Sequence, residues 1–164
     1  MIEVENLSRR FGACTAVDNL SFTVMPGEVL GFLGPNGAGK STTMKMLTGF
    51  LRPSSGRVTI FGYDMWKQPM PAKAMIGYLP EGAPSYGEMT VREFLDFIAA
   101  VRGFRGQEKQ RAIDAVSEKA VLRDVMFQAI DTLSKGYRRR VGLAQAILHD
   151  PRILILDEPT DGLD

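Results

Sequence analysis

Glycines gather in one short stretch of the sequence, residues 34–41 (GPNGAGKS), which matches the pattern G-x-x-x-x-G-K-[ST]. Successive glycines let backbone N–H groups turn inward and form a concave anion nest. A helix N-terminus, which the residues after the stretch predict, adds further donors and the positive end of a dipole. We therefore expect this stretch, the phosphate loop, to cradle a polyphosphate. Its expected contact residues are Gly34, Pro35, Asn36, Gly37, Ala38, Gly39, Lys40, Ser41 and Thr42.

Two side chains at the end of the phosphate loop suit nucleotide chemistry. Lys40 can reach the β- and γ-phosphates, and the Ser41 hydroxyl can ligate Mg²⁺. The alternative is a flexible turn before a structural helix. The apolar run before the loop and the helix formers after it favour a polyphosphate ligand over such a turn.

A second candidate site follows the apolar run at residues 153–156 (ILIL), where Asp157 and Glu158 stand side by side. An acid at the exit of a buried strand lies at the carboxyl edge of the sheet, next to a phosphate loop. Asp157 can hold Mg²⁺ directly or through water, and Glu158 can orient or deprotonate an attacking water. Alone the pair could simply end a strand, but together with the phosphate loop it predicts nucleotide hydrolysis.

The bulk properties are those of a soluble globular chain. It has 164 residues, 45% of them hydrophobic and 24% charged, and a net charge of +1, so no global field drives it onto nucleic acid or anionic lipid. The basic cluster at residues 138–140 is expected to be a solvated helix face. One cysteine excludes an intrachain disulfide, and no apolar run approaches the ~18–20 residues that span a bilayer. Any membrane role is therefore expected to go through a partner.

The elements that must position these sites can be placed from periodicity and turn residues. Strands are predicted at residues 2–7, 16–25, 29–33, 58–61, 74–79 and 153–156, with 29–33 (VLGFL) buried on both faces. Helices are predicted at residues 40–51, 90–101, 108–119 and 135–148, and Thr90 with Glu93 forms a capping box. The order predicts one α/β domain with a helical insertion at about residues 82–148.

Between the two sites, residues 133–137 (LSKGY) precede RRRVGLAQAIL, and here the sequence resembles the nucleotide-binding subunits of ABC transporters. Their signature is Leu-Ser-Gly-Gly-Gln at the start of a helix. The resemblance runs the whole chain and includes DGLD at residues 161–164. It implies a mostly parallel core sheet with an N-terminal antiparallel part. Phe11 matches the aromatic residue that stacks on adenine in that family; the alternative is a core strand aromatic.

The resemblance also implies a composite site and two partners. Two such domains pair head to tail, as a homo- or heterodimer, and ATP on one phosphate loop is capped by the signature helix of the other. Ser134 and Gly136 are the matching residues of this chain. A transmembrane permease is expected to dock near residues 82–90. Tyr86 and Met89 are candidates for exposed apolar contacts there, and both packing inward is the alternative.

Three residues depart from the family pattern. Lys135 and Tyr137 replace a glycine and the glutamine of the signature, and Glu81 stands where the family usually has glutamine. Glu81 lies in the loop that senses Mg²⁺, and its carboxylate can still ligate the ion and assist catalysis. These variants resemble the bacterial branch that serves small exporters and efflux systems.

The expected function is an ATP-binding and ATP-hydrolysing subunit of a bacterial ABC-type exporter, peripheral on the cytoplasmic face of the membrane. Nucleic acid is not an expected partner. A soluble ABC ATPase acting on the ribosome or DNA, or a nucleotide-binding fragment without turnover, is the alternative. The family's strand between the phosphate-loop strand and the acidic strand is missing, so residues 1–164 are expected to be a single partial domain. Alone, the chain should hydrolyse little ATP.

Overall fold

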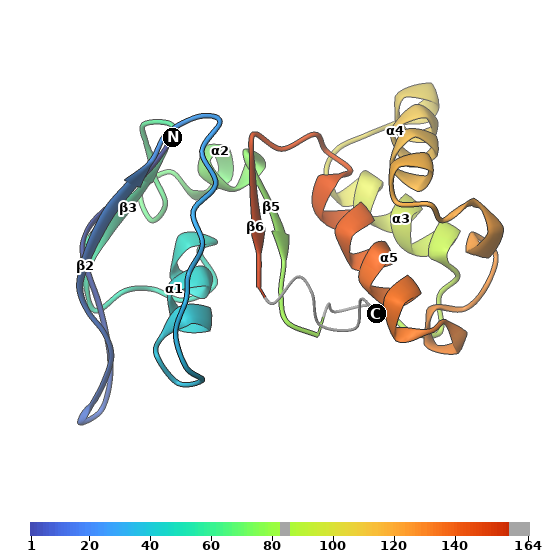
Figure 1. The fold of residues 1–164 in the computed structure, drawn as a ribbon. Helices are drawn as coiled ribbons and strands as arrows, with labels where there is room; N and C mark the ends of the chain where they lie inside the picture. Colours follow the sequence, from blue (N-terminus) through green and yellow to red (C-terminus); the bar gives the residue numbers. More distant parts are fainter. Residues whose placement is uncertain (83–85, 158–164) are drawn as a thin grey trace. The chain divides into compact units, whose positions relative to one another are not determined.

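The computed structural model describes residues 1–82 and 86–157, and the chain divides into two compact units, Met1–Ile76 and Gly77–Asp164. We name them the β unit and the helical unit, and Figure 1 labels their elements. None of the helices in the described part of the chain is long and apolar enough to cross a bilayer.

An antiparallel sheet of four strands, in the order β2-β1-β3-β4, forms the β unit. The strands are β1 Ile2–Phe11, β2 Cys14–Val24, β3 Ser55–Ile60 and β4 Tyr63–Asp64. Ile2 and Val4 of β1 stand opposite Ile60 and Val58 of β3, and all four side chains are buried. The apolar alternation that predicted the first strand therefore reflects one covered face of this sheet.

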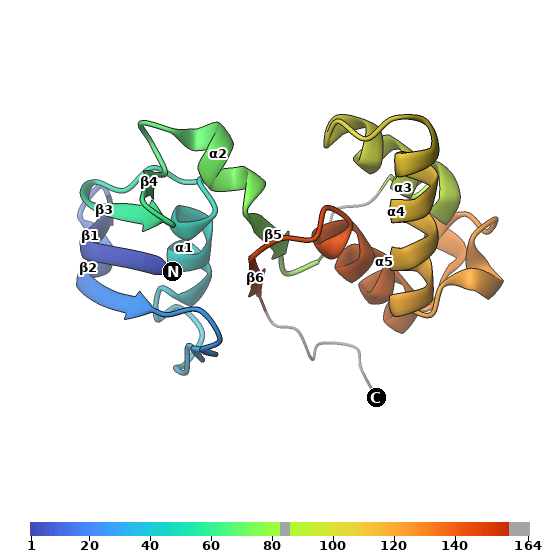
Figure 2. The same cartoon turned by 90° about the horizontal axis from the view of Figure 1, so that it is seen from above.

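Helix α1, Lys40–Leu47, covers one face of the sheet (Figure 2). It buries Thr43, Met46 and Leu47, which lie on one side of the helix. The helix ends earlier than predicted because Gly49 has a left-handed backbone with φ of +71°. The sequence also failed to predict the short helix α2, Pro69–Ala74, which takes the start of the strand expected at residues 74–79.

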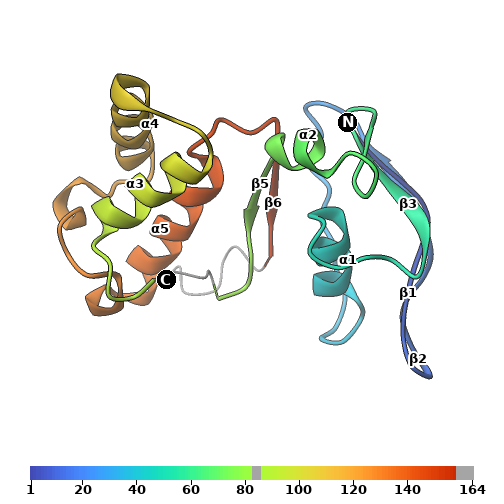
Figure 3. The same ribbon diagram turned by 180° about the vertical axis from the view of Figure 1, so that it is seen from behind.

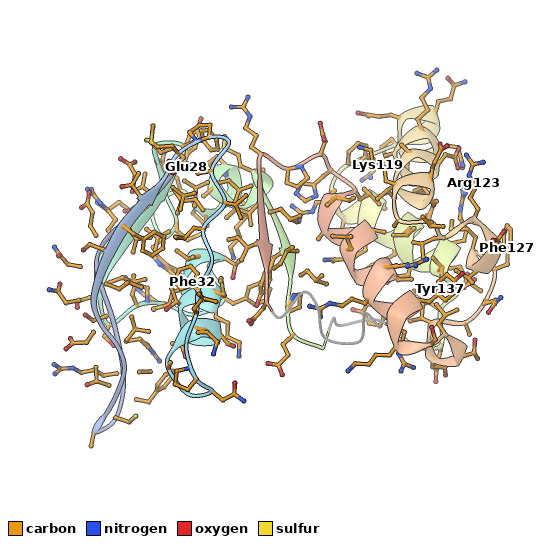
Figure 4. All side chains as sticks on the ribbon, in the orientation of Figure 1. Glu28, Phe32, Lys119, Arg123, Phe127 and Tyr137 are labelled. Carbon is orange, nitrogen blue, oxygen red and sulfur yellow. The ribbon has the colours of Figure 1, made fainter. Side chains whose placement is uncertain are left out.

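Residues 29–33 do not form the buried strand that their apolar character predicted. Val29 and Leu33 are 99% and 97% exposed, and none of the described strands pairs with this segment. The Phe32 ring of this segment, labelled in Figure 4, packs edge-on against the Phe22 ring of β2, with centroids 5.5 Å apart. The prediction was wrong for this structure because a strand needs hydrogen-bonded neighbours, which apolar composition alone does not supply.

Three α-helices and two 3-10 turns share the apolar core of the helical unit. They are α3 Val91–Val101, α4 Gly106–Lys119, α5 Lys135–Ile147, η1 Arg123–Val125 and η2 Ile130–Thr132. The predicted capping box is confirmed at the start of α3. The Thr90 Oγ1 accepts from the Glu93 N–H at 3.2 Å, and the Glu93 carboxylate accepts from the Thr90 N–H at 2.9 Å.

A pair of short parallel strands, β5 Ile76–Leu79 and β6 Ile153–Leu156, lies beside α5 (Figures 1 and 3). Gly77 makes the close approach possible, because a Cβ there would meet the Ala146 carbonyl oxygen at 2.3 Å. The Gln145 side chain donates to the Tyr78 carbonyl at 3.1 Å. Helix α5 is thus packed directly against β5. The predicted α/β class, with an antiparallel N-terminal sheet and a parallel part, is confirmed.

Candidate functional site: a phosphate loop and an acidic strand end

The phosphate loop runs from Gly34 into the first turn of α1, within the β unit. Gly39 is the N-cap of α1 and has φ of +87°, and a Cβ there would meet the Ala16 carbonyl oxygen at 2.3 Å. Gly37 is also left-handed, with φ of +84°. Only glycine accepts these two constraints without strain, so the loop can keep its backbone N–H groups exposed to an anion.

The Lys40 side chain hydrogen-bonds to the loop that precedes it. Its ammonium donates to the Gly34 carbonyl at 2.6 Å and to the Pro35 carbonyl at 2.9 Å. Ser41 follows in the first turn, and the helix has no acidic residue there. A bound phosphate would compete with both carbonyls for the ammonium. The cation, the glycine backbone and the helix start together fit a polyphosphate ligand.

Phe11 ends β1 and is 48% exposed as a residue, and the Arg9 guanidinium lies 4.5 Å from its ring centroid. This exposure does not fit the alternative of a core aromatic. The cation–π contact covers one face of the ring. Adenine stacking on Phe11 stays a prediction.

Asp157 directly follows β6 in the helical unit, and its side chain is buried. Its N–H donates to the Leu79 carbonyl at 2.9 Å, which joins the ends of β5 and β6. Burial, followed by the negative charge of Asp157, raises the pKa of Tyr78 to about 12. A carboxylate at this strand end fits a hard cation such as Mg²⁺.

Glu81 is exposed and follows Pro80, just beyond the end of β5. Glu158, the predicted base, lies outside the described residues. Within residues 1–82 and 86–157, no cluster of three or more His, Cys, Asp or Glu side chains is suited to hold a metal ion. The predicted Mg²⁺ ligands Ser41, Asp157 and Glu81 come from both units, so their joint site stays a prediction.

The signature segment begins α5 as its sequence predicts. Ser134 is the N-cap, and its hydroxyl accepts from the Tyr137 N–H at 3.3 Å. Gly136 lies in the first turn, which carries no acidic residue. The Arg140 guanidinium lies 5.2 Å from the Tyr137 ring, which is labelled in Figure 4. The cap and the helix dipole make this turn favourable for an anion.

The sequence interpretation missed Arg139, which is not part of a solvated face. Its side chain is only 8% exposed, whereas Arg138 and Arg140 are exposed as predicted. The Arg139 guanidinium donates to the Asp157 carbonyl at 2.8 Å and to the Pro80 carbonyl at 3.4 Å. Helical spacing could have predicted this burial, since residues 139, 142 and 146 share the buried side of α5.

Of the two residues predicted to contact the permease, one is exposed and the other packs inward. Tyr86 is 59% exposed, and its ring meets Phe97 edge-on at 5.8 Å. Met89 packs against the core of the helical unit. Of the two, only Tyr86 offers an exposed apolar surface.

Comparison with curated proteins gives relatives over the full chain. It is 41% identical over 164 residues to the probable multidrug ABC transporter ATP-binding protein YbhF of Escherichia coli K12, covering 28% of that protein. It is 40% identical over 169 residues to the ABC transporter ATP-binding protein NatA of Bacillus subtilis, covering 69% of it. It is 40% identical to the bacitracin transport ATP-binding protein BcrA of Bacillus licheniformis, covering 53%.

Solved structures share the fold. An ATP-binding subunit of an ABC transporter superposes with a TM-score of 0.89 at 32% identity, over all of this chain and 68% of that one. The dimeric bacterial ABC transporter cassette MJ0796 gives a TM-score of 0.89 at 22% identity, over 76% of its chain. The family model described as ABC transporter matches residues 17–161. These matches show that the chain belongs to the ABC transporter family of ATP-binding proteins.

Proposed function

We propose that the chain is the nucleotide-binding part of an ATP-hydrolysing subunit that powers a bacterial ABC-type exporter. The observation that carries the proposal is the phosphate loop, where Lys40 lies against two loop carbonyls at the start of α1. A nucleoside triphosphate would interact with the Lys40 ammonium, with the N–H groups of the loop and with the positive end of the α1 dipole.

Each remaining residue has a proposed role in one ATP site. Ser41, Asp157 and Glu81 hold Mg²⁺, which neutralises phosphate charge when bound. Glu158 accepts a proton from the attacking water, and Lys40 stabilises the charge that develops on the phosphates. Phe11 stacks on the adenine ring.

The proposed site is completed by a second ATPase domain in head-to-tail contact. Ser134 and Gly136 present the start of α5 to the nucleotide on that partner, so ATP holds the dimer and hydrolysis releases it. The capped, acid-free first turn of α5 supports this role. In this proposal, the phosphate loop of one domain and the signature helix of the other bind the same nucleotide.

A membrane permease is the proposed second partner, and it would hold the subunit on the cytoplasmic face of the membrane. The exposed Tyr86 ring supports an apolar contact there. The names of YbhF and BcrA, which concern multidrug and bacitracin transport, support the exporter branch. The transported substrate would be selected by the permease.

The test compares two lysines of α1 in the full-length protein. Lys40→Ala should weaken MgATP binding about 10- to 100-fold, because it removes a charge-assisted contact. Lys45→Ala removes an exposed lysine of the same helix and should bind MgATP as the parent does. Isothermal calorimetry measures both affinities, and steady-state phosphate release measures turnover.

Equal MgATP affinity in the Lys40→Ala variant and the parent would place the nucleotide elsewhere. Tight MgATP binding without phosphate release, in the presence of both partners, would instead support a binding module without turnover.

A further inference from the structure

We infer that Arg139 is a positioning residue, which ties helix α5 to the two backbone segments that carry Glu81 and Asp157. The inference rests on the proposed function, because it gives this arginine a role in ATP hydrolysis. It adds a connection within one chain between the signature helix and the acids that act on the nucleotide.

The geometry of the guanidinium carries the inference. One of its terminal nitrogens donates to the Asp157 carbonyl at 2.8 Å, and the other lies 3.4 Å from the Pro80 carbonyl. Pro80 directly precedes Glu81, and Asp157 directly precedes Glu158. One rigid, planar group therefore meets the backbone at both points where an acidic segment leaves its strand.

The two acidic segments are also hydrogen-bonded to each other, so α5, the end of β5 and the end of β6 each bond to the other two. The Asp157 N–H donates to the Leu79 carbonyl at 2.9 Å. The Gln145 side chain, further along α5, donates to the Tyr78 carbonyl at 3.1 Å. Helix α5, the end of β5 and the end of β6 thus hold one another through side-chain and backbone bonds.

Burial of Arg139 argues for a specific role. Its side chain is 8% exposed, on the side of α5 that also carries Gly142 and Ala146. Removing an arginine from water is unfavourable, and an apolar residue usually stabilises a buried helix face at least as well. An arginine is suited to this place because its forked donors reach two carbonyls at once.

The position of Arg139 along α5 connects it to the nucleotide. Ser134 caps α5 five residues earlier, which is about 7.5 Å of helix rise. In the proposed dimer that cap meets the nucleotide of the partner domain. A displacement of α5 on closure would move the guanidinium and, with it, the backbone of both acidic segments.

The test uses variants of Arg139 in the full-length protein with saturating and subsaturating MgATP. Arg139→Ala should lower kcat about 10- to 100-fold, because the acids lose their alignment, while the Kd of MgATP from calorimetry stays within about twofold. Arg139→Lys keeps the positive charge but loses the forked pair of donors. Its kcat should therefore lie between that of the parent and that of the Arg139→Ala variant. Arg111→Ala, an exposed arginine of α4, should behave as the parent.

A second readout does not depend on activity. Amide hydrogen exchange at Asp157 should be faster in Arg139→Lys than in the parent, without nucleotide, because one anchor of the segment is weakened. Exchange in the core of α3 should be unchanged.

Three results would overturn the role of Arg139: parental kcat in the Lys variant, parallel changes of kcat and Kd in the Ala variant, or unchanged exchange at Asp157. A parent that neither binds nor hydrolyses ATP would instead defeat the proposed function. The exchange measurement would still decide whether Arg139 anchors the segment.

Discussion

At the scale of single residues, each unit has a cation that donates to backbone carbonyls. Lys40 bonds to the carbonyls of Gly34 and Pro35. Arg139 bonds to the carbonyls of Pro80 and Asp157. Neutral acceptors leave a lysine available for phosphate, because a charge-assisted bond to phosphate is stronger than a bond to a carbonyl. The buried Arg139 guanidinium donates to two carbonyls at the same time, which suits a fixed anchor.

Tyr78 gives a residue-scale prediction for the effect of pH on stability. Its ordinary pKa of 10.0 is raised to about 12 in the folded chain, by burial and then by the charge of Asp157. The folded state holds the phenolic proton more tightly than the unfolded state does. The contribution of this proton to the free energy of unfolding is therefore complete below pH 10 and is lost as pH rises toward about 12. Tyr78→Phe should therefore gain stability relative to the parent above about pH 10.

Urea unfolding of the parent and the Tyr78→Phe variant, at a series of alkaline pH values, measures this difference. A stability difference that stays constant across the series would contradict the assigned perturbation of Tyr78.

Local geometry was predictable where the residues concerned are close together in the sequence. The cap of α5 is an example, because the Ser134 hydroxyl and the Tyr137 N–H from which it accepts a hydrogen bond are three residues apart. Arg139 was missed because its two acceptors are 59 and 18 residues away in the chain. The run of three arginines suggested a solvated face, whereas helical phase places its middle member on the buried side of α5.

Secondary-structure elements followed the same division between local and distant causes. The capping box of α3 depends on Thr90 and Glu93 alone, so the sequence predicted it fully. The apolar runs at residues 29–33 and 153–156 look alike, yet only the second is a strand, because β5 pairs with it. Strand formation requires a partner from elsewhere in the chain, and no local pattern contains that information.

The cap of α3 provides the prediction at the scale of elements. Thr90→Ala removes the acceptor for the Glu93 N–H and should destabilise the helical unit by about 1 kcal/mol. Thr90→Ser keeps a hydroxyl at the N-cap and should stay close to the parent. Chemical denaturation followed by far-ultraviolet circular dichroism measures both variants. An alanine variant as stable as the serine variant would show that the cap bond contributes nothing.

The whole molecule combines a β unit that holds the phosphate loop with a helical unit that holds the signature helix and the acidic strand end. The sequence predicted membership of the family through its resemblance to ABC transporter subunits, and the family match over residues 17–161 confirms it. One domain with a helical insertion at about residues 82–148 stays a prediction. The chain spans 28% to 69% of the length of the three relatives described. The activity of the whole protein and its partners therefore remain proposals.

The central claim is that ATP joins two such domains and that hydrolysis separates them. Glu158→Gln, in the full-length protein, tests it most directly, because the variant should lose the base but keep the shape of the site. Light scattering after size exclusion, with and without MgATP, measures the dimer, and phosphate release measures turnover. We expect a stable dimer only with MgATP, together with phosphate release at least about tenfold slower than the parent's. A variant that stays monomeric in saturating MgATP, or that hydrolyses ATP at the parental rate, would contradict the claim.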